Sequence, residues 1–99
     1  MRPAPLTAEE LTRAAAALPA WTAGPEVLTR AVEFPSFLVA VGFITELAPV
    51  AERMDHHPDL LLSWRRVELR LTTHSAGAVT ALDVELAREL DPIIERLVG

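Results

Sequence analysis

The sequence predicts an α+β fold in which helices cover one face of an antiparallel sheet. Apolar residues recur at helical spacing near both ends of the chain and in its middle, and segments with strand-like alternation lie between them. Two of these segments are separated by only two residues, which is typical of an antiparallel hairpin. The 99 residues suffice for one modest core, so residues 1–99 are interpreted as a single domain.

The first predicted element is a helix over about residues 8–18. Thr7 and Glu10 have the spacing of a capping box, and apolar residues follow them at helical intervals. Pro19 ends this helix. After a glycine-proline turn, residues 27–34 alternate between apolar and polar types, which predicts a strand with one face partly exposed.

A second helix is predicted from Phe37 to about Met54, with Ser36 as its cap. Its first half is apolar on nearly every side, so we expect it to contact two layers. Pro49 lies inside the helix and predicts a kink, because proline removes one backbone hydrogen bond. Pro58 disfavours helical geometry in the residue before it, so the helix should end near residues 55–56.

Two antiparallel strands and a third helix complete the chain. The strands are expected at residues 60–64 and 67–72, with Arg65-Arg66 as the tight connection. Thr80 is the predicted cap of the last helix, in which Asp83 lies near the positive end of the helix dipole. Asp83 also begins the inward apolar stripe, so its side chain should face the sheet; the stripe continues through Leu86, Ala87, Leu90, Ile94 and Leu97.

The composition excludes several kinds of chemistry. The chain has no Cys, Lys, Tyr, Asn or Gln, which rules out disulfides, thiolate nucleophiles and lysine Schiff bases. Proton transfer would therefore depend on the 3 histidines, His56, His57 and His74, helped by some of the 14 carboxylates.

The charge and hydropathy indicate which partners and compartment to expect. Nine arginines against 14 carboxylates give a net charge of −5, which disfavours binding to nucleic acid or to an anionic membrane surface. No apolar run reaches the roughly 20 residues that span a bilayer, and we expect a soluble cytoplasmic protein. The 51% hydrophobic content predicts that apolar surface is buried between subunits.

All three histidines are expected at one end of the sheet. His56 and His57 precede one strand of the predicted hairpin and His74 follows the other, so both points lie at its open end. Asp83 starts the next helix near that end, and Glu52 lies one helical turn before His56. Five ionisable side chains from four segments therefore converge on a candidate site.

Each of these residues also has a structural interpretation. Asp83 could serve only as a capping carboxylate, and Glu52 could be a solvated residue paired with an arginine. Trp21 is more often a core or interface residue than a ligand platform. A three-histidine zinc site is an alternative, but adjacent ligands are awkward for one ion, so no metal is predicted and acid/base chemistry is preferred.

The spacing of these groups is similar to that of a known family. The run from Glu52 through Asp55-His56-His57-Pro58 is followed by Thr72-Thr73-His74 and then by Thr80-Ala81-Leu82-Asp83. This combination resembles pterin-4a-carbinolamine dehydratases, and the likeness begins at Leu18-Pro19-Ala20-Trp21. It implies a four-stranded antiparallel sheet with three helices packed on one face, in the order α-β-β-α-β-β-α.

The resemblance also implies an activity and a role for each residue. A member of this family dehydrates 4a-hydroxytetrahydropterin to quinonoid dihydropterin without a metal or organic cofactor, supporting aromatic amino acid hydroxylases. His56 and His74 would be the acid/base pair, His57 would position the substrate, and Glu52 and Asp83 would orient and polarise the imidazoles. Contacts to the pterin would come from the histidines and from Pro58, Thr73, Ser75 and Ala76, with Trp21 as a wall of the pocket.

Some positions differ from the pattern expected of the family, and these leave the proton-transfer groups intact. They are Leu60, Trp64, Ala78, Ala81-Leu82 and the two helix prolines, Pro49 and Pro92. The resemblance implies a homo-oligomer, either a dimer or a tetramer. The alternative function is a non-catalytic protein-binding module on the same scaffold, since relatives act as transcriptional coactivators or assembly factors.

Overall fold

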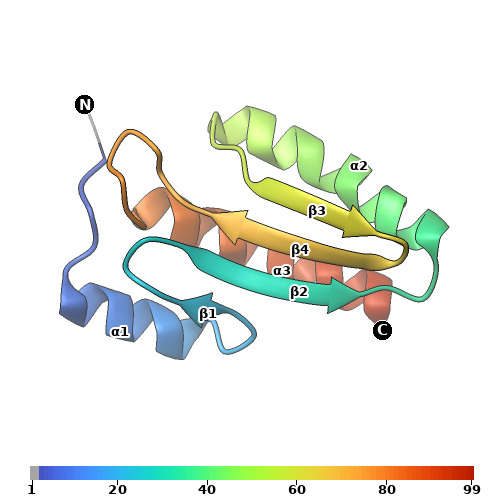
Figure 1. Cartoon of the computed structure of the whole chain (residues 1–99), viewed down its shortest axis with the longest axis horizontal. Coiled ribbons are helices and arrows are strands. Elements are labelled where there is room, and N and C mark those ends of the chain that lie inside the picture. Colours follow the sequence, from blue (N-terminus) through green and yellow to red (C-terminus); the bar gives the residue numbers. More distant parts are fainter. Residues whose placement is uncertain (1–2) are drawn as a thin grey trace.

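The computed structural model describes residues 3–99 and confirms the α+β class and the α-β-β-α-β-β-α order (Figure 1). The helices are α1 (Ala8–Ala17), α2 (Phe37–Met54) and α3 (Ala81–Val98), and the strands are β1 (Thr22–Ala23), β2 (Leu28–Glu33), β3 (Asp59–Ser63) and β4 (Arg66–Leu71). The strands form one antiparallel sheet in the order β1-β2-β4-β3, so β1 and β3 are its two edges.

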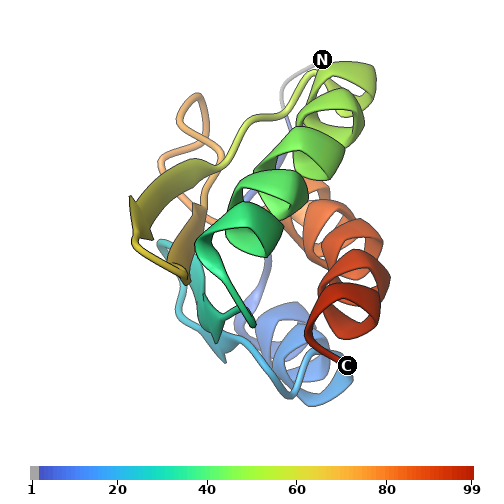
Figure 2. The ribbon, with the colours of Figure 1, turned by 90° about the vertical axis from the view of Figure 1, so that its right-hand side faces the viewer.

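The helices lie on one side of this sheet. Figure 2 shows α2 and α3 next to each other on that side, with α1 close to the end formed by β1. Alternate residues of β4 follow this division: Val67, Leu69 and Leu71 are buried, whereas Arg66 and Arg70 are exposed. The core between the layers includes Leu28, Val32, Phe34, Phe43, Leu47, Leu86, Leu90 and Ile94.

Local sequence signals fix where the helices begin and end. Thr7, Ser36 and Thr80 are the caps of α1, α2 and α3, as predicted, and each side chain accepts a backbone hydrogen bond from the first turn of its helix. α2 ends at Met54, and its C-cap, Asp55, adopts a left-handed conformation with φ of 49°. Both α2 and α3 continue through their internal prolines. Within residues 3–99, no helix combines the length and hydropathy needed to cross a bilayer.

The connection between β3 and β4 differs from the prediction by one residue. Ser63 pairs with Arg66, so the tight turn is Trp64-Arg65 and not Arg65-Arg66. Trp64 adopts φ of 56°, in the left-handed region that two-residue hairpin turns use. Aromatic residues rarely adopt this conformation, and so the sequence pattern did not reveal the turn. Both strands begin one residue earlier than expected.

Candidate active site

Asp83 is the centre of a buried polar network at the start of α3. It is the third residue of the helix, where its Oδ2 accepts a hydrogen bond from the backbone N–H of Thr80 at 2.9 Å and completes a capping box. The side chain is fully buried. The predicted inward orientation is therefore confirmed, and the carboxylate has both a capping contact and a position beneath the site.

Two further side chains bind this carboxylate. The Thr73 hydroxyl donates to Oδ2 at 2.8 Å, and His56 Nε2 lies 2.6 Å from Oδ1. Thr73 Oγ1 also lies 2.7 Å from the Thr80 hydroxyl. Because the Thr73 proton is used on Asp83, the Thr80 hydroxyl is the donor to Thr73. We call these four residues, His56, Thr73, Thr80 and Asp83, the Asp83 network.

The network determines the state of the His56 ring. A buried carboxylate is stable only when its oxygens accept hydrogen bonds, and here Nε2–H of His56 is one of the donors. The neutral ring then carries its lone pair on Nδ1, which makes no hydrogen bond with residues 3–99. His56 is thus held in the tautomer whose Nδ1 carries the lone pair.

The end of α2 positions His56 and His57. The left-handed Asp55 turns the chain, and the His56 N–H donates to the Ala51 carbonyl at 3.0 Å. His57 remains exposed, with its Nε2 3.6 Å from Oε2 of Glu52. Glu52 therefore lies near His57 and not His56, and both side chains of this pair are mainly in solvent.

His74 lies in a closed loop that follows β4. The Thr73 N–H donates to Ala78, and the Gly77 N–H donates to the His74 carbonyl. Gly77 has φ of 63°, a left-handed conformation that glycine adopts without strain. The loop holds His74 exposed beside the buried Thr73.

A surface cavity of about 270 Å³ brings the three histidines together. We call it the histidine hollow; its lining consists of Pro3, Asp55, His56, His57, Thr72, Thr73, His74, Ser75 and Leu82. The predicted convergence of His56, His57 and His74 is thus present in the structure. Asp83 lies below this lining and contacts it through His56 and Thr73.

Not all residues assigned to the site by sequence line the histidine hollow. Among residues 3–99, Pro58 and Ala76 do not line it, although each is adjacent in sequence to a lining residue. Glu52 does not line it either, but its carboxylate lies near the lining residue His57. Trp21 belongs to the core, where its indole Nε1 donates to Asp91 Oδ1 at 2.7 Å. The expectation that Trp21 forms a wall is therefore not met by its position.

Several residues at the site were not predicted from the sequence. Pro3, Asp55, Thr72 and Leu82 line the histidine hollow, and Thr80 supplies a hydroxyl as well as a helix cap. Thr72 and Asp55 could have been predicted from the sequence, because each is adjacent to a predicted site residue, Thr73 or His56. Within residues 3–99, no group of three or more His, Asp or Glu residues is arranged to hold a metal ion.

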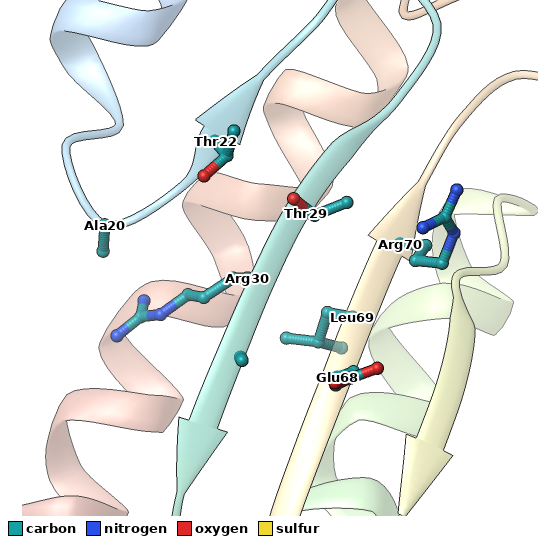
Figure 3. Close-up of a pocket in the computed structure, with 8 residues that line it drawn as sticks. Ala20, Thr22, Thr29, Arg30, Glu68, Leu69 and Arg70 are labelled. Carbon is teal, nitrogen blue, oxygen red and sulfur yellow. The ribbon is translucent and has the colours of Figure 1, made fainter.

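A second cavity, of about 340 Å³, lies over β2 and β4 and contains no histidine (Figure 3). Its arginines point in different directions: Arg30 extends toward α3, whereas Arg70 extends away from it. The Arg30 guanidinium donates to Asp91 Oδ1 at 2.6 Å, so its charge is already paired. This cavity is larger than the histidine hollow, but its ionisable lining residues are arginines and one glutamate.

The fold and the site define a small α+β protein with a histidine-carboxylate site at one end of its sheet. Residues 4–93 match the family model described as pterin 4 alpha carbinolamine dehydratase, and the chain belongs to that family. The resemblance drawn from the sequence is confirmed.

Relatives match over nearly the whole chain. Proteins named "Putative pterin-4-alpha-carbinolamine dehydratase" include one from Mycobacterium sp. (strain JLS), which is 41% identical over 92% of this chain and 97% of its own length. Another, from Bradyrhizobium diazoefficiens, is 43% identical over 95% of this chain and 96% of its own.

Solved structures are also similar to the chain. A transcriptional coactivator/pterin dehydratase from Brucella melitensis has a TM-score of 0.84 and 40% identity, covering 90% of this chain and 97% of that one. A pterin dehydratase-like protein identified as a RuBisCO assembly factor in the alpha-carboxysome has a TM-score of 0.53 and 21% identity, covering 80% and 87%. This second likeness concerns the fold alone.

Proposed function

We propose that the protein dehydrates 4a-hydroxytetrahydropterin to quinonoid dihydropterin by histidine acid/base catalysis. The observation that carries the proposal is the buried contact of 2.6 Å between His56 and Asp83 beneath a cavity that His57 and His74 also line. Membership of the dehydratase family supports the choice of a pterin as substrate. The reaction needs only proton transfers, which suits a site built on imidazoles.

The proposed reaction removes one water molecule. His56 Nδ1 accepts the proton of the ring nitrogen next to the carbinol carbon, while protonated His74 donates a proton to the departing hydroxyl. A carbon-nitrogen double bond forms as the carbon-oxygen bond breaks, so the products are water and quinonoid dihydropterin. Asp83 stabilises the positive charge that His56 acquires, and proton return between the imidazoles through solvent restores the starting state.

The remaining residues would bind and orient the pterin. His57, held near Glu52, positions the substrate, and Pro58 shapes the entry beside it. The Thr73 to Ala76 loop offers backbone groups and the Ser75 hydroxyl to the polar edge of the ring. In this proposal the reaction uses no metal or organic cofactor, takes place in the cytoplasm and supports an aromatic amino acid hydroxylase.

The experiment follows the decay of freshly generated 4a-hydroxytetrahydropterin. The wild-type protein should accelerate dehydration, and the double variant His56→Ala/His74→Ala should not. Circular dichroism should verify that the double variant remains folded. A wild-type rate equal to that of the double variant would exclude the proposed activity. Glu9→Gln, an exposed change on α1, is the matched control and should retain the wild-type rate.

A protein-binding role on the same scaffold is the second candidate. It is favoured by the similarity to a structure described as a transcriptional coactivator/pterin dehydratase and by the apolar side chains that the protein exposes on α2 and β3. A strain carrying His56→Ala separates the two functions. If the variant loses dehydratase activity but the strain keeps the wild-type phenotype, the binding role accounts for the phenotype; loss of both supports catalysis.

A further inference from the structure

The histidine hollow has one apolar side. Most of its lining side chains are polar or ionisable, and they come from the end of α2 and from the loop after β4. Among residues 3–99, the two apolar side chains in the lining are Pro3 and Leu82, and both are partly buried. They belong to the segment before α1 and to the first turn of α3. The proposed dehydration gives neither residue a part, so this side is available for another role.

The first turn of α3 holds Leu82 in a fixed position. Its backbone N–H donates to the Thr80 hydroxyl at 3.3 Å, within the same cap that places Asp83. Asp83 follows Leu82 directly and contacts His56. Side chains on a rigid element hold their positions more precisely than side chains on a loop. The apolar side therefore has a set position relative to the imidazole of His56.

A backbone hydrogen bond fixes the segment that carries Pro3. The Leu6 N–H donates to the Val79 carbonyl at 3.0 Å, and the Leu6 side chain packs against the core. This contact joins the segment before α1 to the residue before Thr80. Proline has no backbone N–H, and the side chains of Pro3 and Leu82 contain no polar atom. A polar group of a ligand therefore finds no side-chain hydrogen-bond partner on this side of the hollow.

A reduced pterin is also divided into a polar and an apolar part. Its pyrimidine ring carries amino and carbonyl groups, whereas its second ring carries the carbons C6 and C7. C6 is bonded to the ring nitrogen N5, whose proton His56 accepts in the proposed reaction. We infer that Leu82 and Pro3 bind the substituent on C6, and that the hollow selects a pterin with a short alkyl group there over one with a hydroxylated chain. The inference rests on the proposed function and names the substrate class within it.

The two parts of the ligand match two sides of the hollow. In the proposed function the polar edge of the ring binds the loop from Thr73 to Ala76, where Ser75 lines the hollow. The opposite, carbon edge then meets the side that offers no polar partner. The reverse orientation would place the amino and carbonyl groups against Leu82 without hydrogen bonds, and the desolvation cost of those groups would exceed the gain from contacts of the carbons.

The size of the hollow also favours a short substituent. Its volume of about 270 Å³ is below the roughly 300–1,000 Å³ of pockets that enclose drug-sized ligands. Transfer of one methyl group from water to a contact with Leu82 strengthens binding by about fourfold. A hydroxyl at the same place loses its hydrogen bonds to water and regains none from Leu82 or Pro3, which cancels that gain.

A series of three ligands tests the preference by binding alone. The probes are 7,8-dihydropterin, its 6-methyl derivative and its 6-hydroxymethyl derivative, which differ only at C6. Isothermal titration calorimetry gives a Kd for each. The wild-type protein should bind the 6-methyl compound about fourfold more tightly than the unsubstituted one, and the 6-hydroxymethyl compound no more tightly than the unsubstituted one.

Serine at position 82 should remove the preference. Leu82→Ser takes away the apolar side chain, so the advantage of the 6-methyl compound should fall from about fourfold to less than about twofold. Val84→Ser is the matched control, because Val84 is also partly buried in the first turn of α3 but lines a different cavity, against α1. It should keep the wild-type ratio. Pro3→Ser, outside the helices and strands, should lower the ratio in the same direction as Leu82→Ser.

The ratio of two Kd values within one protein does not depend on its stability, so a variant that is only less stable keeps the wild-type ratio. Equal Kd values for the three ligands in the wild type, or a ratio that Leu82→Ser and Val84→Ser change equally, would overturn the inference and leave the proposed function in place. Failure of every ligand to bind would exclude the pterin function and the inference with it.

Discussion

Two aspartates of α3, eight residues apart, bind their partners in contrasting ways. Asp83 is fully buried and contacts His56, Thr73 and Thr80, whereas Asp91 is partly exposed and accepts hydrogen bonds from Trp21 and Arg30 on one oxygen. We call Asp91, Trp21 and Arg30 the Asp91 cluster. Its donors are an indole N–H and a guanidinium. The Asp83 network includes an imidazole, which can exchange a proton.

The Asp91 cluster is a structural contact, whereas the Asp83 network belongs to the proposed active site. The Asp91 cluster joins the segments around β1 and β2 to α3, and its contacts are complete without a ligand. The buried hydrogen bonds of the Asp83 network are also formed without a ligand, but its histidine, His56, lines a surface cavity. The proposed difference in function follows from the partners of the two carboxylates, because only the Asp83 network includes a histidine.

Loss of Asp83 should have the largest effect. Asp83→Asn keeps the shape of the side chain but removes the negative charge that supports a protonated His56. We expect the dehydration rate to fall by about 10²–10⁴-fold and the free energy of unfolding to fall by about 1–3 kcal/mol. Steady-state kinetics and urea denaturation measure the two effects. Full activity in Asp83→Asn would show that the two aspartates do not differ as described.

Asp91→Asn should change stability without changing the reaction. The amide cannot balance the charge of Arg30, and the pair is only partly buried, so we expect a loss of about 1–2 kcal/mol. The urea midpoint should decrease while kcat/KM at fixed temperature stays within about twofold of the wild type. A large loss of kcat/KM in a folded Asp91→Asn protein would link this cluster to the site.

Thr73→Val should produce a smaller change in the Asp83 network. Valine has the shape of threonine but removes the hydroxyl that joins Thr80 to Asp83. We expect about 1 kcal/mol of destabilisation, since the buried partners lose one hydrogen bond each. Thr45→Val is the control, because that exposed hydroxyl bonds only the Val41 carbonyl within α2. Equal losses in both variants would argue against a coupled network.

The smallest effect on stability is expected at Glu10. This residue has the same place in the capping box of α1 as Asp83 has in that of α3, but it is exposed. The backbone hydrogen bond from Thr7 holds the pKa of Glu10 below its usual 4.5, with the Thr7 side chain acting in the same direction. Its stabilising contribution is therefore present above pH 4.5 and is lost as the pH falls through the lower folded value. The urea midpoints of wild type and Glu10→Gln should differ at pH 6 and converge near pH 3; a constant difference would contradict this linkage.

Much of the fold could be predicted from local patterns. The caps at Thr7, Ser36 and Thr80 are short-range features, and the helical spacing from Asp83 correctly oriented that side chain. The turn at Trp64 was misplaced, because its left-handed backbone depends on the pairing of β3 with β4 rather than on local preference.

The site was predictable only as far as topology could bring residues together. Antiparallel pairing was enough to bring the three histidines to one end. It could not reveal that Trp21 reaches Asp91, 70 residues away in the sequence, or that Thr80 meets Thr73 through their hydroxyls. These contacts depend on how the helices pack on the sheet, and that packing has no short sequence signature.

The capping box of α3 couples a helix end to the proposed active site. Because Oδ2 of Asp83 receives the Thr80 N–H while Oδ1 contacts His56, opening the first turn of α3 would release the imidazole as well. A ligand that binds His56 only while Asp83 holds its ring stabilises the closed state of the helix end, and therefore makes that opening rarer. Amide hydrogen exchange at Thr80 should therefore slow on pterin binding, which makes the start of this helix a reporter of occupancy.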